Sequence, residues 1–218
     1  MAREAFHDQL EQLQSELLHM GTVVEEAIER SVRSLAEQDT ALAQAVIDGD
    51  DQADELELDI EQRCLALFAL QQPMATDLRS IGTALKIVTD LERMADHATD
   101  IAKVTLRLAG QPLIKPLIDI PRMAAIAQTM VREALSAYVN RDADLAYNMI
   151  ARDDEVDHLY SQIFRELLTY MLEDPRTVQQ ATYLIFVSKY LERIADHATN
   201  LGEWVIYMVT GERKELND

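Results

Sequence analysis

The chain has 218 residues and few of the residue types that stabilise disulfide-rich, β-rich or membrane proteins. Its one cysteine, Cys64, excludes an intramolecular disulfide and a thiolate cluster. Six glycines, five prolines and an aromatic content of 6% suit long helices better than a β sandwich. No run of about 18 apolar residues occurs, and the N-terminus lacks the apolar core of a signal peptide. We therefore expect a cytoplasmic protein without direct membrane insertion.

Positive charge is also scarce. Twenty basic residues stand against 39 acidic ones, a net charge of −19, and no cluster of lysines or arginines occurs. Such a chain is unsuited to binding a nucleic-acid backbone or adsorbing to anionic lipid through bulk electrostatics. We expect no nucleic-acid partner.

What the chain does contain is a repeat. Residues 91–99 read Leu-Glu-Arg-Met-Ala-Asp-His-Ala-Thr, and residues 191–199 differ from them only by Ile194 in place of Met94. Further identities lie 103 residues apart, such as Asp39 with Asp142 and Leu56 with Leu159. Matches of this extent indicate an internal duplication.

Helical periodicity runs through most of both copies. Asp39, Asp142 and Asp174 are suited to be N-caps. A stretch that holds three of the five prolines separates the copies. The pattern predicts an all-α fold of two tandem antiparallel three-helix bundles, with repeats at 1–110 and 122–218 and a linker at 111–121. The predicted helices cover residues 3–37, 40–71, 75–109, 120–140, 142–173 and 177–211.

Each copy of the repeated segment carries two acids at helical spacing, Glu92 with Asp96 and Glu192 with Asp196. The two acids are at positions i and i+4, so both lie on one face, beside the apolar face of the helix. Like charges at this spacing repel each other. The simplest alternative is a solvated helix edge with ion pairs such as Lys189 with Glu192.

The preceding helix of each half adds further acids. With an uninterrupted helix over 40–71, Asp51 and Asp54 fall on the same seam as Leu58 and Leu65, which we expect to face the core. In the second half, the seam holds Asp154, Asp157, Phe164 and Leu168. Acids in the first turn of a helix would complement its dipole. Asp51 and Asp154, however, would stand about three turns inside these helices.

Register places the acids of each half at one level. Asp54 lies 19 residues before Pro73 and Glu92 lies 19 residues after it, and equal distances from a turn mean equal height in an antiparallel hairpin. Several carboxylates at one level require a compensating cation. All-oxygen ligation suits Mg²⁺, Mn²⁺, Ca²⁺ or iron. The candidate ligands are Glu92, Asp96, Asp100, Asp51 and Asp54 in the first half, and Glu192, Asp196, Asn200, Asp154 and Asp157 in the second.

Histidines contribute less to this prediction. His97 and His197 lie well away from the glutamates around their helices, and we expect them at the surface or in inter-helix hydrogen bonds. A di-iron oxygenase would need Glu-x-x-His, and residue 95 is alanine.

The doubled motif, Leu-Glu-Arg-Met-Ala-Asp-His-Ala-Thr-Asp and Leu-Glu-Arg-Ile-Ala-Asp-His-Ala-Thr-Asn, resembles that of the PhoU family over essentially the whole chain. The family comprises accessory proteins of phosphate-specific transport systems, whose Glu/Asp-x-x-x-Asp motifs bind multinuclear iron or zinc clusters. The resemblance implies a metal-binding negative regulator of phosphate uptake and phosphate-starvation signalling. It also implies two partners, the ATPase subunit of the phosphate ABC transporter and the phosphate-sensing histidine kinase, and a location at the membrane through them. The family and the helical hairpins favour a homodimer.

Two other functions compete with regulation. One is a metal-dependent enzyme, either a phosphohydrolase or an oxygenase. The sequence offers no evident nucleophile, no phosphate-binding glycine loop and no general-base histidine on the carboxylate face, so we expect no enzymatic activity. The other is a metal store, which would bind many ions per chain.

Overall fold

The computed structural model describes residues 2–71, 73–213 and 216, and all regular structure within those residues is helical. The all-α prediction is therefore confirmed. In chain order, the elements are α1 (Ala2–Glu37), α2 (Thr40–Ile47), α3 (Asp51–Gln71), α4 (Ala75–Leu108), α5 (Asp119–Asn140), α6 (Ala143–Ile150), α7 (Asp153–Glu173), the short 3₁₀ helix η1 (Pro175–Thr177) and α8 (Val178–Thr210).

Helix starts follow from local side chains. The Asp39 carboxylate accepts hydrogen bonds from the backbone N–H groups of Ala41 and Leu42, at 3.0 and 2.9 Å. Asp142 accepts one from Leu145 at 2.9 Å, and Asp174 caps η1 in the same way. These bonds satisfy N–H groups that a helix leaves unpaired at its start. All three predicted N-caps are confirmed.

Two of the predicted helices are in fact broken. Residues 48–50 separate α2 from α3, and residues 151–152 separate α6 from α7. Gly49 lies in the first break, where glycine costs about 1 kcal/mol relative to alanine in a helix. The acids that follow favour a new helix start through the dipole. Asp51 and Asp154 are thus first-turn residues, and the argument that they lie three turns inside was wrong.

The breaks also change which face of each helix is buried. Leu58 is 56% exposed and Leu65 is 60% exposed, and Phe164 and Leu168 are exposed as well. The prediction that these residues face the core was wrong. The buried residues of α3 are instead Ala53, Ile60, Cys64 and Leu67, because interrupting the helix changed its phase.

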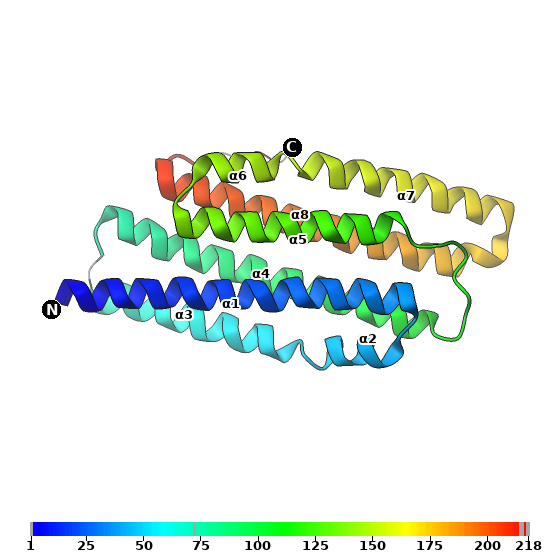
Figure 1. Cartoon of the computed structure of the whole chain (residues 1–218), viewed down its shortest axis with the longest axis horizontal. Coiled ribbons are helices and arrows are strands. Elements are labelled where there is room, and N and C mark those ends of the chain that lie inside the picture. The colour runs from blue at the N-terminus through cyan, green and yellow to red at the C-terminus, as the bar shows by residue number, and fades with distance from the viewer. Residues whose placement is uncertain (1, 72, 214–215, 217–218) are drawn as a thin grey trace.

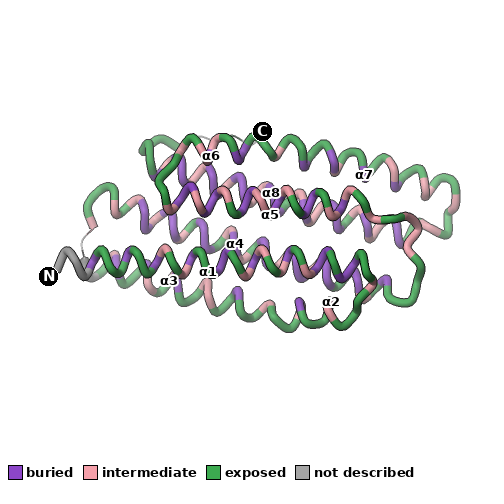
Figure 2. The backbone as a smooth tube through the Cα atoms, in the orientation of Figure 1, coloured by how far each residue is buried: buried purple, intermediate pink, exposed green. Residues whose placement is uncertain are grey.

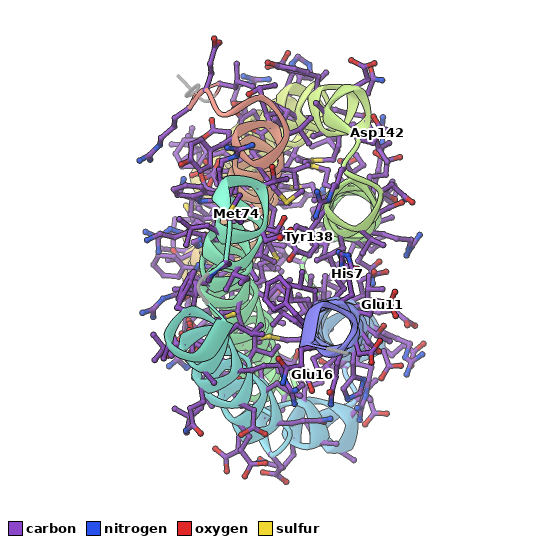
Figure 3. The ribbon with its side chains drawn as sticks, turned by 90° about the vertical axis from the view of Figure 1, so that its left-hand side faces the viewer. His7, Glu11, Glu16, Met74, Tyr138 and Asp142 are labelled. Carbon is purple, nitrogen blue, oxygen red and sulfur yellow. The ribbon has the colours of Figure 1, made fainter. Side chains whose placement is uncertain are left out.

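The helices form two layers with two edges (Figure 1). In one layer α1 lies beside α5, and in the other α4 lies beside α8. The α2–α3 pair covers one edge and the α6–α7 pair covers the other (Figure 1). The view along the helices shows both layers end on (Figure 3).

One hydrophobic core joins the two repeats. It contains Leu17, Leu91, Leu135 and Leu191, all nearly inaccessible to solvent and contributed by both halves. Buried residues lie along the sides of the helices that face one another (Figure 2). The two three-helix units are therefore packed together rather than separated as beads on a string. None of the described helices combines the length and the apolarity needed to cross a bilayer.

Candidate acidic metal centres

The repeated segments sit in the middle of α4 and α8, with one side in the core. Leu91, Met94, Ala95 and Ala98 are buried, and this fixes Glu92 and Asp96 at the boundary between core and solvent. The Glu92 side chain is only 15% exposed. The same packing in α8 leaves Glu192 at a similar depth. Because the neighbouring residues of each helix face are buried, the carboxylates of Glu92 and Glu192 are partly removed from solvent.

The first acidic group comprises Asp50, Asp54, Glu57, Glu92 and Asp96, from the α2–α3 break, α3 and α4. The pKa of Glu92 is raised to about 7. Burial is the largest cause, the charges of Asp96, Glu57 and Asp54 add to it, and Arg93 partly offsets it. Burial also raises the pKa of Asp50, and the hydrogen bond from Thr99 opposes that shift. The Thr99 hydroxyl donates to Asp50 at 3.0 Å. These carboxylates therefore share one electrostatic environment.

The second acidic group comprises Asp153, Asp154, Asp157, Glu192 and Asp196, from α7 and α8. The pKa of Asp153 is raised to about 7, chiefly by burial and also by the charges of Asp196, Asp157 and Glu192. The pKa values of Asp157 and Asp196 are raised by burial and by Glu192, and Lys189 lowers both. Lys189 is ion-paired with Glu192, as the sequence suggested.

An excess of buried acceptor oxygens characterises the second group. Asp153 Oδ1 is buried and has no hydrogen-bond partner among the described residues. A buried carboxylate oxygen without a donor is costly, and a cation would supply the missing interaction. Hard, oxygen-preferring ions match this set of donors. Within the described residues, however, no three His, Cys, Asp or Glu side chains are arranged as a ready-made metal site.

Not every proposed ligand belongs to these groups. Asp51 is exposed on the first turn of α3. Asp100 pairs with Lys103 at 3.0 Å. Asn200 donates a long hydrogen bond of 3.4 Å to Asp90. The structure does bring Glu92, Asp96 and Asp54 into one group, and Glu192, Asp196, Asp154 and Asp157 into the other.

Sequence reasoning missed Asp50, Glu57 and Asp153. A signal for two of them was present, because Asp50 and Asp153 are identical residues 103 positions apart in the repeat. Their importance comes from the breaks before α3 and α7, which place them beside the repeated segments.

The α4–α8 axis, the line along which these two helices pack, has Asp96 of the first acidic group and Asp196 of the second beside it. His197 Nδ1 lies 2.8 Å from Asp90 Oδ1, and this contact confirms the expected inter-helix role of His197. The repeat-equivalent pair is His97 with Tyr190, whose rings stack with their centroids 5.7 Å apart. An open groove of about 490 Å³ lies at the axis. It is lined by Arg93, Asp96, His97, Asp100, Arg193, Asp196 and His197.

Comparison with known proteins identifies the duplicated unit. The PhoU domain model matches residues 17–105 and again residues 120–205, so the two matches begin 103 residues apart, which is the offset of the internal repeat. The chain belongs to the PhoU family. The recognition made from the repeated motif is thereby confirmed.

Close relatives cover the chain from end to end. A phosphate-specific transport system accessory protein PhoU homolog from Clostridium acetobutylicum is 46% identical over all of both chains. Another, from Aquifex aeolicus, is also 46% identical, over 94% of this chain and 92% of its own length. The crystal structure of PhoU from Pseudomonas aeruginosa superimposes with a TM-score of 0.90 at 39% identity, covering 95% of this chain and all of that one.

Proposed function

We propose that this protein is an accessory protein of a phosphate-specific transport system that restrains phosphate uptake and phosphate-starvation signalling. The observation that carries the proposal is the full-length identity of 46% to a relative with that accessory role. The doubled PhoU domain supports it, because both repeats are retained.

The two acidic groups are proposed to hold cations. Their donors are carboxylate oxygens, several with raised pKa values, and Asp153 Oδ1 is buried without a partner. A bound Mg²⁺, Mn²⁺, Ca²⁺, iron or zinc ion would neutralise this charge. In each half the cation would tie the α3 or α7 start to the middle of α4 or α8, and so fix the position of an edge helix relative to the central layer.

Regulation is proposed to work through protein partners. The ATPase subunit of the phosphate ABC transporter and the phosphate-sensing histidine kinase are the expected ones, and the chain would reach the membrane through them from the cytoplasm. A homodimer is part of the same proposal. The net charge of −19 favours partners with basic surfaces, since complementary charge accelerates association and selects partners.

Metal analysis by mass spectrometry on untagged protein tests the cation sites. The Asp96→Ala, Asp196→Ala double variant should lose most of the bound metal. A control double variant, Glu11→Ala with Asp144→Ala, removes two exposed acids outside both groups and should keep its metal. Unchanged metal content in the Asp96, Asp196 variant would refute the ligand assignment. Binding of many ions per chain would instead favour a metal store.

A deletion strain tests the regulatory role. Cells that lack this protein and any second copy should express phosphate-starvation genes in phosphate-rich medium, and the wild-type chain should restore repression. Normal repression in the deletion strain would contradict the proposal. Metal-dependent hydrolysis of a phosphate ester by the purified protein would favour the phosphohydrolase alternative.

A further inference from the structure

The first half has an open groove between α1 and α3, which we call the α1–α3 groove. Its volume is about 490 Å³. Leu56 and Ala66 form its accessible apolar part, above the buried Ile60. Its polar part is lined by Glu16, Asp59 and Arg63. Glu16 faces α3 (Figure 3) and pairs with Arg63 at 2.6 Å. Asp59 is then the acid of the groove that makes no ion pair within the described part of the chain. The groove therefore offers both apolar contact and negative charge.

The second half has the same architecture, but the corresponding region is closed. The cavity between the start of α5 and α7 measures only about 10 Å³. The linker covers it, and the Lys115 side chain is 11% exposed and ion-paired with Glu166 of α7. Leu117 packs against the core beside it.

The linker is held in this position by α8. The Gln180 side chain accepts a hydrogen bond from the backbone N–H of Ile114 and donates one of 3.1 Å to the carbonyl of Pro112. In the second half, this surface is therefore covered by the linker. The linker is an extended segment with one lysine and several aliphatic side chains. In the first half, helix α1 continues through the corresponding positions and leaves the groove open.

Charge distinguishes the possible occupants of the open groove. Residues 2–71 contain four basic and 17 acidic residues, so this part of the chain carries −13 of the total −19. By contrast, residues 119–140 of α5 contain two of each sign. A second copy of the chain would bring equal negative charge to the groove and be repelled, whereas a basic segment would be attracted.

We propose that the α1–α3 groove docks a lysine- or arginine-bearing segment of a protein partner, with an aliphatic side chain on Leu56 and Ala66 and a cation beside Asp59. This inference rests on the proposed adaptor role, for which it names a partner surface. The test of docking uses purified protein and a synthetic peptide. Failure of the peptide to bind would therefore leave the deletion-strain test of regulation unaffected.

The probe is the linker sequence as a capped octapeptide, Gln-Pro-Leu-Ile-Lys-Pro-Leu-Ile, added to the full chain with labelled isoleucine and leucine methyl groups. We expect chemical-shift changes at Leu56, Ile60 and Leu67, and binding at least tenfold weaker at 1 M than at 0.05 M salt. A peptide with glutamate in place of lysine should bind at least tenfold more weakly. No shifts, or shifts confined to the second half, would overturn the proposal.

Matched variants separate docking from general effects. Ala66→Trp fills the groove and should abolish peptide binding, whereas Thr169→Trp at the corresponding exposed position of α7 should leave it unchanged. Asp59→Lys should weaken binding at least tenfold, and its counterpart Gln162→Lys should weaken it less than twofold. Each variant is first checked for native thermal unfolding, and Asp59→Lys alone decides the test if Ala66→Trp fails to fold. Equal effects of variant and control would contradict the assignment.

Sedimentation of the protein without peptide tests the other possible occupant of the groove, a second copy of the chain. If Ala66→Trp, but not Thr169→Trp, converts a dimer into a monomer, the groove is an interface between copies of this chain and the proposal is wrong. An unchanged sedimentation coefficient, together with lost peptide binding, supports it.

Discussion

The two halves of the chain bury an equivalent aspartate in different ways. In the first half, the Thr99 hydroxyl donates a hydrogen bond of 3.0 Å to Asp50. In the second half, Thr199 Oγ1 and Asp153 Oδ1 occupy the repeat-equivalent positions, and both atoms are buried without a hydrogen-bond partner. The sequence identity of a threonine and an aspartate therefore does not guarantee the bond between them.

A second difference lies at the axis between α4 and α8. His197 is held by Asp90, while the equivalent His97 meets Tyr190 and keeps a buried Nδ1 without a partner. Burial lowers the pKa of His97 to about 4, and the nearby His197 and Arg193 contribute to the shift. One substitution between the copies, aspartate for tyrosine, is enough to give two identical histidines different environments.

These differences show that the two halves kept the same buried core positions after duplication, whereas the polar contacts of their acidic groups diverged. The core positions are shared, whereas polar contacts depend on a few side chains that changed independently. We therefore expect the two acidic groups to bind cations with different affinities. The following experiments test the shared frame first and the diverged contacts afterwards.

The largest effect should come from the shared core. Leu91 and Leu191 are equivalent and fully buried, so Leu91→Ala and Leu191→Ala should each lower the free energy of unfolding by about 2–5 kcal/mol. Because one core joins both halves, denaturant unfolding monitored by circular dichroism should stay a single transition in both variants. Two separate transitions would show that the repeats fold independently.

The next effect concerns Asp153 in metal-free protein. Its folded-state pKa of about 7 lies above the unfolded value of 3.8, so the folded state keeps a proton that the unfolded state loses between those pH values. Stability contributed by this group is thus lost as pH rises from about 4 to about 7. Asp153→Asn should raise the free energy of unfolding by about 1–3 kcal/mol at pH 8, a range that already allows for solvent screening of the charge. At pH 4 the substitution should hardly change the free energy of unfolding.

Asp50→Asn provides the comparison for that experiment. It should stabilise less, because Thr99 already donates to the Asp50 carboxylate. Denaturant titrations at several pH values measure both variants. A saturating divalent cation should reverse the order, making wild type more stable than Asp153→Asn at pH 8 if the second acidic group binds it.

The threonines should respond in opposite directions. Thr99→Val removes a donor to a carboxylate and should cost about 1–2 kcal/mol, whereas Thr199→Val removes a buried hydroxyl without a partner and should be neutral or stabilising. Thermal unfolding at pH 7 measures the difference. Equal losses in the two variants would show that Thr199 does make a hydrogen bond in solution.

The smallest effect should come from the unpaired histidine. His97→Phe keeps a ring against Tyr190 and removes a buried nitrogen without a partner, so stability should change by less than about 1 kcal/mol. His197→Phe removes the contact with Asp90 and should cost more, about 1–3 kcal/mol. If His97→Phe proves the more damaging, the environments of the two histidines have been misassigned.

Much of the architecture could be predicted from local pattern. The all-α class, the N-caps Asp39, Asp142 and Asp174, and the grouping of Glu92 with Asp96 follow from residues close together in the chain. The duplication follows from the near-identity of segments about 100 residues apart. The incorrect predictions also arose from local features of the chain. The breaks before α3 and α7 were missed, and the seam through Leu58 and Leu65 was assigned to the wrong face as a result.

The sequence by itself determined the helices, the repeat and the level at which the acids lie, because a helix is specified by side-chain periodicity and capping within a few residues. Tertiary structure alone decided the rest. Whether Asp50 meets Thr99, or Asp90 meets His197, depends on how helices far apart in sequence pack against each other. The raised pKa values of Glu92 and Asp153 arise in the same way, since desolvation is a property of the assembled core and not of the residue.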